Sequence, residues 1–155
     1  MIDGPAVGET IEDSQEVTIE RTASHIGSGA LRVYATPAMA LFVERSCHAL
    51  IARHLPPEKT SVGVELKVRH MAPSPLGATV HLRAEVLAIE GERVDFRCRL
   101  WDDVEPVGEV EHVRRVVETA RFLRRVEEKG RAMSQTLPGE SVSPAEGDLS
   151  PRRDA

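Results

Sequence analysis

Apolar residues recur at three- and four-residue steps between residues 35 and 54, which is the spacing of one buried helix face. Thr36 is a favourable N-cap, and Pro37 suits the first helical turn, where a missing N–H leaves no hydrogen bond unmade. Pro56 and Pro57 end the pattern because neither can continue a helix. The sequence therefore predicts one helix of roughly 18 residues, about 27 Å long. The residues predicted to share its buried face are Met39, Phe42, Val43, Cys47, Leu50 and Ile51.

After this helix, apolar and polar residues alternate, which is the pattern of strands with one buried face. The alternation predicts strands at 62–70, 79–89, 93–101 and 104–118, separated by turn sequences rich in Pro, Gly and Asp. Connections this short join antiparallel neighbours. In the first strand Gly63 falls on the polar face, and the residues predicted to face the core are Val62, Val64, Leu66, Val68 and His70.

The residues before the helix give a weaker pattern. Residues 1–14 are polar and acidic, and we expect a flexible arm there. Weak alternation over 15–22 indicates an edge strand. The Gly- and Ser-rich stretch 23–30 indicates a mobile loop, and 31–34 a short strand that leads into the helix.

The C-terminal residues 130–155 are rich in Ser, Pro, Gly and charge and carry almost no large apolar side chain, so we expect them to be disordered. Residues 120–129 either extend the last strand or form a short helix. The predicted organisation is one domain over residues 15–129, preceded by the flexible arm and followed by the disordered tail.

One amphipathic helix lying on an antiparallel sheet is an α+β architecture. A curved antiparallel sheet that wraps one long helix is the hot-dog fold, which we take as the predicted fold. Such a sheet leaves an edge unpaired, and pairing across a two-fold axis would cover it. We therefore expect a homodimer, or a dimer of dimers, with the functional site at or near the seam between protomers.

Composition limits the partners of the chain. The net charge is −5 and the basic residues are scattered singly, which argues against a nucleic acid partner. No apolar run approaches about 18 residues and the N-terminus is acidic, so we expect neither a membrane span nor a signal peptide. Cys47 and Cys98 fall on predicted apolar faces, as buried thiols of a cytoplasmic protein do. No Cys or His cluster has the spacing of zinc ligands, and no metal is expected.

Three residues carry candidate chemistry. Thr36 lies at the helix start, Glu44 within the helix, and His70 on the buried face of the strand expected to cover it. Each has an ordinary alternative: a cap, a solvated acid and a core histidine. Together, a hydroxyl, a carboxylate and an imidazole form an acid–base set. The free N–H groups at the helix N-terminus suit an oxyanion.

These residues belong to a longer series of motifs that resembles the fluoroacetyl-CoA thioesterase-like branch of the hot-dog thioesterases over about residues 15–129. The family's catalytic set is a Thr, a Glu and a His, and the resemblance assigns these roles to Thr36, Glu44 and His70. It also implies that Gly63 lies beside the thioester and that His112 and Arg114 bind substrate. The matching residues are Ala35-Thr36-Pro37-Ala38-Met39, Glu44, Gly63, the run HMAPSPLG from His70, Val107-Gly108, His112-Val113-Arg114 and Arg121-Phe122.

The chain also departs from the family pattern. Val110 stands where the family usually has a second glycine in the last strand. The stretch 23–30 has no aromatic residue, so selectivity for a fluorinated acyl group is not implied. Arg114 and Arg115 are candidates for the phosphates of coenzyme A, although strand arginines are commonly only solvated.

The resemblance implies an acyl-CoA thioesterase that needs no cofactor beyond the coenzyme A of its substrate. Attack by the Thr36 hydroxyl, by the Glu44 carboxylate or by water stays open at this point. An acyl-CoA hydratase or dehydratase on the same fold would use an Asp or Asn shortly before a His. The chain has no asparagine, and no Asp lies shortly before His70 or His112. A non-catalytic acyl-CoA-binding module remains open, because binding needs the same pocket.

Overall fold

The computed structural model describes residues 4–135, so most of the predicted tail, residues 136–155, lies outside the described part. The chain divides into two compact units, residues 1–119 and 120–155. The first unit carries, in chain order, β1 (Thr10–Glu16), the 3₁₀ turn η1 (Ile19–Arg21), α1 (Ala23–Ile26), α2 (Thr36–Ala52), β2 (Lys59–His70), β3 (Thr79–Glu90), β4 (Arg93–Trp101) and β5 (Pro106–Glu118).

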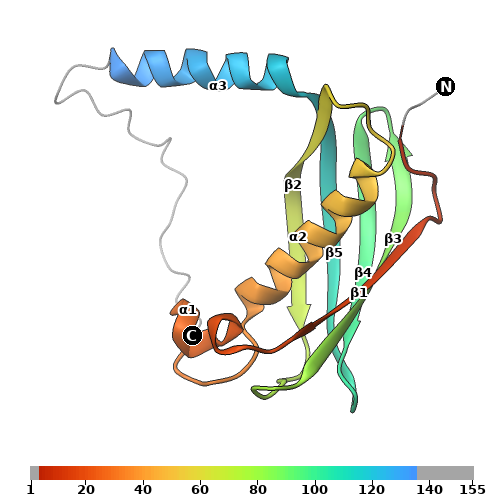
Figure 1. Cartoon of the computed structure of the whole chain (residues 1–155), viewed down its shortest axis with the longest axis vertical. Coiled ribbons are helices and arrows are strands. Elements are labelled where there is room, and N and C mark those ends of the chain that lie inside the picture. The colour runs from red at the N-terminus through yellow and green to blue at the C-terminus, as the bar shows by residue number, and fades with distance from the viewer. Residues whose placement is uncertain (1–3, 136–155) are drawn as a thin grey trace, which may run out of the picture. The chain divides into compact units, whose positions relative to one another are not determined.

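The five strands form one antiparallel sheet in the order β1-β3-β4-β5-β2, and α2 lies across one face of it (Figure 1). This is the predicted α+β arrangement. The predicted buried face of α2 is confirmed, since all six of its residues are at most 6% exposed. The alternation of β4 is confirmed as well, and its buried residues are Val94, Phe96, Cys98 and Leu100.

Helix α2 begins differently from the prediction. Its N-cap is Ala35, whose backbone is extended, and Thr36 is the first helical residue. The prediction of Thr36 as the N-cap was therefore wrong. Its hydroxyl forms a hydrogen bond with His70 at the end of β2 and does not cap its own helix. A capping rule considers only neighbouring residues and cannot anticipate a partner on a distant strand.

Strand β2 contains a bulge at Val64 that the sequence pattern did not predict. The pairing of β2 with β5 shifts register between Gly63 and Glu65, so Val64 is an extra residue and is 62% exposed. Because each extra residue moves the following side chains to the other face, the alternation changes phase at this point. Gly63 therefore faces α2, where a Cβ would lie 3.1 Å from Glu44 Oε2. The prediction that Gly63 and His70 lie on opposite faces was wrong.

The N-terminal segment is more ordered than predicted. Strand β1 begins at Thr10, inside the segment expected to be a flexible arm, and pairs with β3 from Thr10 to Glu16. Its side chains are largely polar because an edge strand is held by backbone hydrogen bonds, so hydrophobic alternation did not reveal it.

The stretch predicted to be a loop contains helix α1, whose first turn is capped by the hydroxyl of Thr22 and which ends at Gly27 with φ 91°. In place of the strand predicted over 31–34, only isolated bridges at Val33 and Tyr34 occur. The bends at residues 31–32 and the start of α2 at Thr36 leave no room for a longer ladder.

The second unit contains helix α3, Thr119–Ser134. Of the two alternatives for residues 120–129, the helix is correct. It continues to Ser134, so the first residues of the predicted disordered tail are helical. Across the residues that the structure describes, no helix is long and apolar enough to cross a membrane.

Candidate active site

Thr36 and His70 meet where the start of α2 passes the end of β2. Thr36 Oγ1 lies 2.8 Å from His70 Nδ1, a hydrogen-bond distance. The ring of Tyr34 stands edge-on to the imidazole, with ring centroids 6.1 Å apart. Tyr34 is itself held through a hydrogen bond from Gln15 Nε2 to its hydroxyl, which connects the pair to β1. Two of the three residues of the predicted acid–base set are therefore in direct contact.

The second ring nitrogen of His70 is available for proton transfer. Nε2 is buried and has no hydrogen-bond partner among residues 4–135. Burial lowers the pKa of His70, and the backbone of Ala72 opposes this only in part. The ring is therefore neutral near pH 7, with one nitrogen bonded to Thr36 and the other available to accept or donate a proton. Unpaired polar atoms inside proteins are uncommon and mark this nitrogen as a functional candidate.

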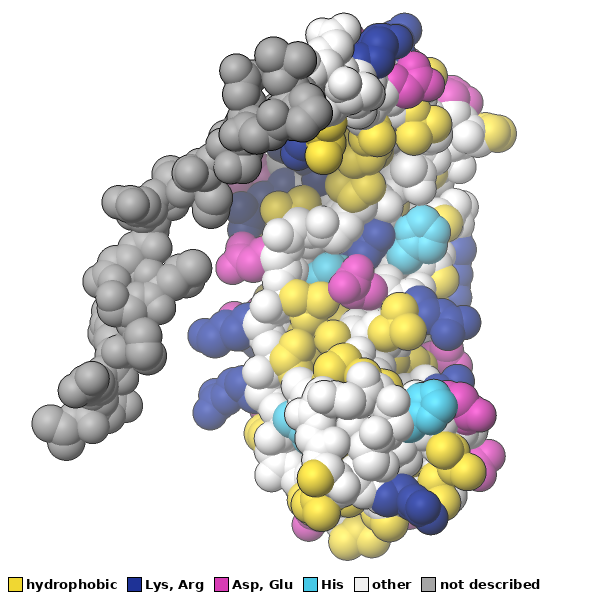
Figure 2. Space-filling view, turned by 90° about the vertical axis from the view of Figure 1, so that its left-hand side faces the viewer, with side chains coloured by type: hydrophobic (Ala, Val, Ile, Leu, Met, Phe, Trp, Pro, Cys, Tyr) yellow, Lys and Arg dark blue, Asp and Glu magenta, His cyan; other side chains and the backbone are white. Residues whose placement is uncertain are grey.

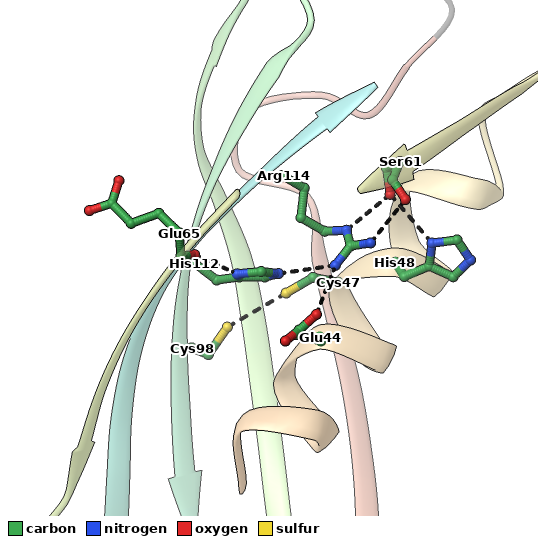
Figure 3. A network of polar contacts seen from close by, with 8 residues as sticks. All are labelled: Glu44, Cys47, His48, Ser61, Glu65, Cys98, His112 and Arg114. Carbon is green, nitrogen blue, oxygen red and sulfur yellow. Dashed lines mark hydrogen bonds and ion pairs between the residues drawn. The ribbon is translucent and has the colours of Figure 1, made fainter. Parts of the chain in front are cut away.

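A second polar cluster lies farther along α2 and is centred on Arg114, which is only 5% exposed (Figure 3). Its Nε donates to Ser61 Oγ at 3.0 Å, and its Nη2 donates to the Ser61 carbonyl oxygen at 3.0 Å. Its Nη1 lies 3.2 Å from His112 Nε2. An arginine held in this way is part of the interior, so the alternative that Arg114 is only a solvated strand arginine was wrong.

His112 is locked in one neutral form by its two partners. Arginine has only donors, so His112 Nε2 must accept from Arg114, and Nδ1 must carry the proton that is donated to the Glu65 carbonyl at 2.8 Å. Burial lowers the pKa of His112, with a smaller contribution from the Arg114 charge. Because both nitrogens are committed, His112 orients its neighbours and does not transfer protons in this arrangement.

Glu44 lies at the open side of this cluster. Its side chain is 44% exposed, and Oε2 is 3.7 Å from Arg114 Nη1. The missing side chain of Gly63 lets the carboxylate approach the backbone of β2 closely, since a Cβ there would also lie 3.5 Å from both Arg114 and His112. Burial lowers the pKa of Arg114 and the Glu44 charge opposes that effect. The three residues predicted to bind substrate thus surround Glu44 within one chain.

The predicted acid–base set is divided between these two clusters. Thr36 and Glu44 are eight residues apart on α2, which corresponds to about 12 Å along the helix axis. Within the described residues, no hydrogen bond or ion pair joins Glu44 to His70. The predicted set of a hydroxyl, a carboxylate and an imidazole is therefore not assembled at one place within the single chain.

Two residues of the second cluster were not anticipated. Ser61 contacts Arg114 through both its hydroxyl and its carbonyl, and His48 Nδ1 lies 3.4 Å from the Ser61 hydroxyl. A serine in a strand and a histidine on an exposed helix position carry no signal in one sequence.

The cysteines behave as predicted. Cys47 and Cys98 are free and fully buried, with their sulfur atoms 3.7 Å apart. The contact with Cys98 and burial raise the pKa of the Cys47 thiol, so it stays protonated and unreactive.

No group of three or more His, Cys, Asp or Glu side chains in the described part of the chain is arranged to hold a metal ion.

Comparison with known proteins connects this geometry to one family. The family model described as "FlK: Fluoroacetyl-CoA-specific thioesterase" matches residues 17–120. The fluoroacetyl-CoA thioesterase of Streptantibioticus cattleyicolor is 31% identical over 135 residues, which cover 83% of this chain and 97% of the relative.

Solved structures agree with this match. The fluoroacetyl-CoA thioesterase FlK superposes with a TM-score of 0.76 at 31% identity, covering 82% of this chain and 98% of FlK. A hot-dog-like protein from Thermanaerovibrio acidaminovorans superposes with a TM-score of 0.75 at 27% identity, covering 79% of this chain and 91% of that one. The predicted hot-dog fold is thereby confirmed.

Proposed function

Because this chain belongs to the family of fluoroacetyl-CoA-specific thioesterases, we propose that it hydrolyses the thioester of a small acyl-CoA to a free acid and coenzyme A. The observation that carries the proposal is the Thr36–His70 pair, in which a neutral imidazole holds one nitrogen against a hydroxyl and keeps the other buried and unpartnered. A ring in this state can take a proton from an attacking group at neutral pH.

The chemistry assigns a role to each part of the site. His70 Nε2 removes a proton from water as the water attacks the thioester carbonyl, and the same nitrogen returns the proton to the departing sulfur of coenzyme A. Thr36 holds the ring at Nδ1. The first turn of α2 leaves backbone N–H groups without helical partners, and these stabilise the oxyanion. Glu44 orients the water, and Gly63, which carries no side chain, lies beside the thioester. The reaction needs no further cofactor.

We propose that the two clusters form one site between two copies of the chain, with Glu44 of one copy joining the Thr36–His70 pair of the other. Strand β2 is an edge of the sheet, so its outer side is available for pairing. Seen from the side of β2 and α2, hydrophobic side chains are exposed among acidic, basic and histidine side chains (Figure 2). Exposed residues of these two elements include Leu41 and Val64, at 56% and 62%. We propose a homodimer in which β2 pairs with the partner's β2.

The bulge fixes the register of this pairing. In an unbroken strand, Gly63 and His70 would point to opposite faces, and two-fold pairing could not bring them together. With Val64 as an extra residue, both face the helix side. Antiparallel pairing about an axis at Lys67 then places Gly63 of one protomer opposite the partner's His70. The Glu44 beside that Gly63 then lies next to the water from which the unpartnered Nε2 of the partner's His70 takes a proton.

A cysteine at the axis tests this register. We expect Lys67→Cys to form an inter-chain disulfide under oxidised glutathione, because directly opposed residues in antiparallel strands have Cα atoms about 4.5–5.5 Å apart. Arg69→Cys is the matched control, since it lies two residues farther from the axis on the same face and is expected not to cross-link. The native Cys47 and Cys98 do not compete because both are fully buried. A cross-link at position 69 and none at 67 would exclude this register.

A panel of acyl-CoA substrates tests the activity itself. We expect release of free thiol from small acyl-CoA thioesters, measured with a thiol reagent, and no change in the acyl chain. A hydratase would alter the acyl chain without releasing thiol, and a binding module would do neither. Either of those results would contradict the proposed hydrolysis. The cytoplasmic location remains a prediction from the sequence.

A further inference from the structure

We propose that Ser61 is a positioning residue of this site, which sets the orientation of the Arg114 guanidinium and through it the carboxylate of Glu44. This inference rests on the proposed thioesterase function, in which Glu44 orients the attacking water. Ser61 lies on β2, just before the bulge, and touches Arg114 with both its side chain and its backbone (Figure 3).

The donor and acceptor roles in the cluster are fixed by chemistry. Arg114 carries five N–H donors in one plane and no acceptor. Ser61 accepts from Nε and from Nη2, and His112 accepts from Nη1. Three contacts at three corners leave the guanidinium no freedom to rotate. One of the two remaining N–H groups is on Nη1, the atom that lies 3.7 Å from Glu44 Oε2.

Of the three contacts to Arg114, only the one with the Ser61 hydroxyl can be removed by a substitution that leaves the other two in place. The Ser61 carbonyl is part of the backbone, and His112 is held by the Glu65 carbonyl. Without the hydroxyl, the Arg114 Nε–H would lie buried with no acceptor. The guanidinium would then tilt toward another acceptor, because a buried unpaired donor is costly. Any such tilt moves Nη1 relative to Glu44.

Glu44 needs this fixed neighbour because its side chain is 44% exposed and, among residues 4–135, Arg114 is the one cation with which it forms an ion pair. A 44% exposed glutamate samples several rotamers, and the Arg114 charge selects those that lie next to Gly63. Ser61 therefore acts on the placement of a reacting group and not on the affinity for the coenzyme A part of the substrate. Its loss should lower kcat and leave KM nearly unchanged.

The test compares Ser61→Ala with Thr60→Ala, which removes a hydroxyl from the neighbouring position of the same strand. We expect Ser61→Ala to lower kcat about tenfold with KM within about twofold, and Thr60→Ala to leave both near the values of the unaltered protein. In a Glu44→Ala background, Ser61→Ala should reduce kcat no further, because it acts through Glu44. An undiminished kcat in Ser61→Ala, or an equal loss in both backgrounds, would overturn the proposal.

A measurement without substrate separates this inference from the proposed function. The Arg114 Nε–H of the full-length protein should give a slowly exchanging ¹⁵N–¹H signal that Ser61→Ala abolishes while Ser61→Thr, which keeps the hydroxyl, preserves it. Absence of a protected Nε–H in the unaltered protein would overturn the Ser61 contact whatever the activity. A protected signal in a protein that releases no thiol from any acyl-CoA would instead refute the thioesterase function and leave the contact intact.

Discussion

His70→Ala is expected to lower kcat for thioester hydrolysis by about 10²-fold or more, the usual scale for the loss of a positioned acid–base group. The imidazole is the one group at the start of α2 with a buried, unpartnered nitrogen among the described residues. Its hydrogen bond with Thr36 fixes the orientation of the ring, and therefore the direction in which the unpartnered nitrogen points. Removing the ring removes both the proton acceptor for water and the proton donor for the sulfur.

The pH profile gives a second readout for the same residue. Burial lowers the pKa of His70 below its ordinary value of about 6.5. The ring must be neutral to accept a proton, so kcat/KM should be level near pH 7 and fall as the pH drops through the lowered pKa. Because the shift is downward, this acid limb lies on the acid side of pH 6.5 and not above it.

A matched control is His81→Ala, which removes a histidine of β3 that contacts Trp101 at the end of β4 and Asp103 in the loop between β4 and β5. This variant should keep kcat within about twofold and retain the acid limb, since surface substitutions away from the site have small effects. If His70→Ala kept kcat within about threefold on a good substrate, the assignment of the proton carrier would be refuted.

The elements with strong periodicity were predictable from sequence. Helix α2 and strand β4 each bury one complete face, so the spacing of apolar residues fixes them almost alone. Strand β1 was placed too late in the chain because its residues are mostly polar, and its position depends on backbone pairing with β3. Backbone pairing between segments that are distant in sequence cannot be read from the local spacing of apolar and polar residues.

The sequence predicted which residues belong to the candidate site, but it did not predict which of them are in contact. Motif resemblance pointed to Thr36, Glu44 and His70, and the structure confirms contact for the first and last only. The bulge at Val64 decides which residues of β2 face the helix. Because Val64 is apolar and fits the alternating pattern of the sequence, the pattern does not reveal the bulge. Ser61 was missed because its importance arises from the side chain of Arg114, which lies 53 residues away in sequence.

The division of the site leads to the prediction with the second largest effect. Mixing His70→Ala protein with Glu44→Ala protein, each nearly inactive alone, should restore about a quarter of the activity of the unaltered protein. Random exchange of subunits makes about half of the dimers mixed, and in each of these one of the two sites receives both His70 and Glu44. A gain from two inactive proteins requires that the two residues of one site come from different chains.

The reciprocal mixture distinguishes a shared site from a site within one chain. A chain carrying both substitutions, paired with an unaltered chain, leaves each shared site without one of its two residues, so these mixed dimers should be inactive. If each chain held a complete site, the same mixed dimers would keep half of their activity and the first mixture would recover nothing. Subunit exchange is verified by tagging one chain and isolating the mixed dimer. The separation of about 12 Å between Thr36 and Glu44 along α2 favours the shared site, because the hydroxyl that contacts His70 lies more than two helical turns from the carboxylate of the same chain.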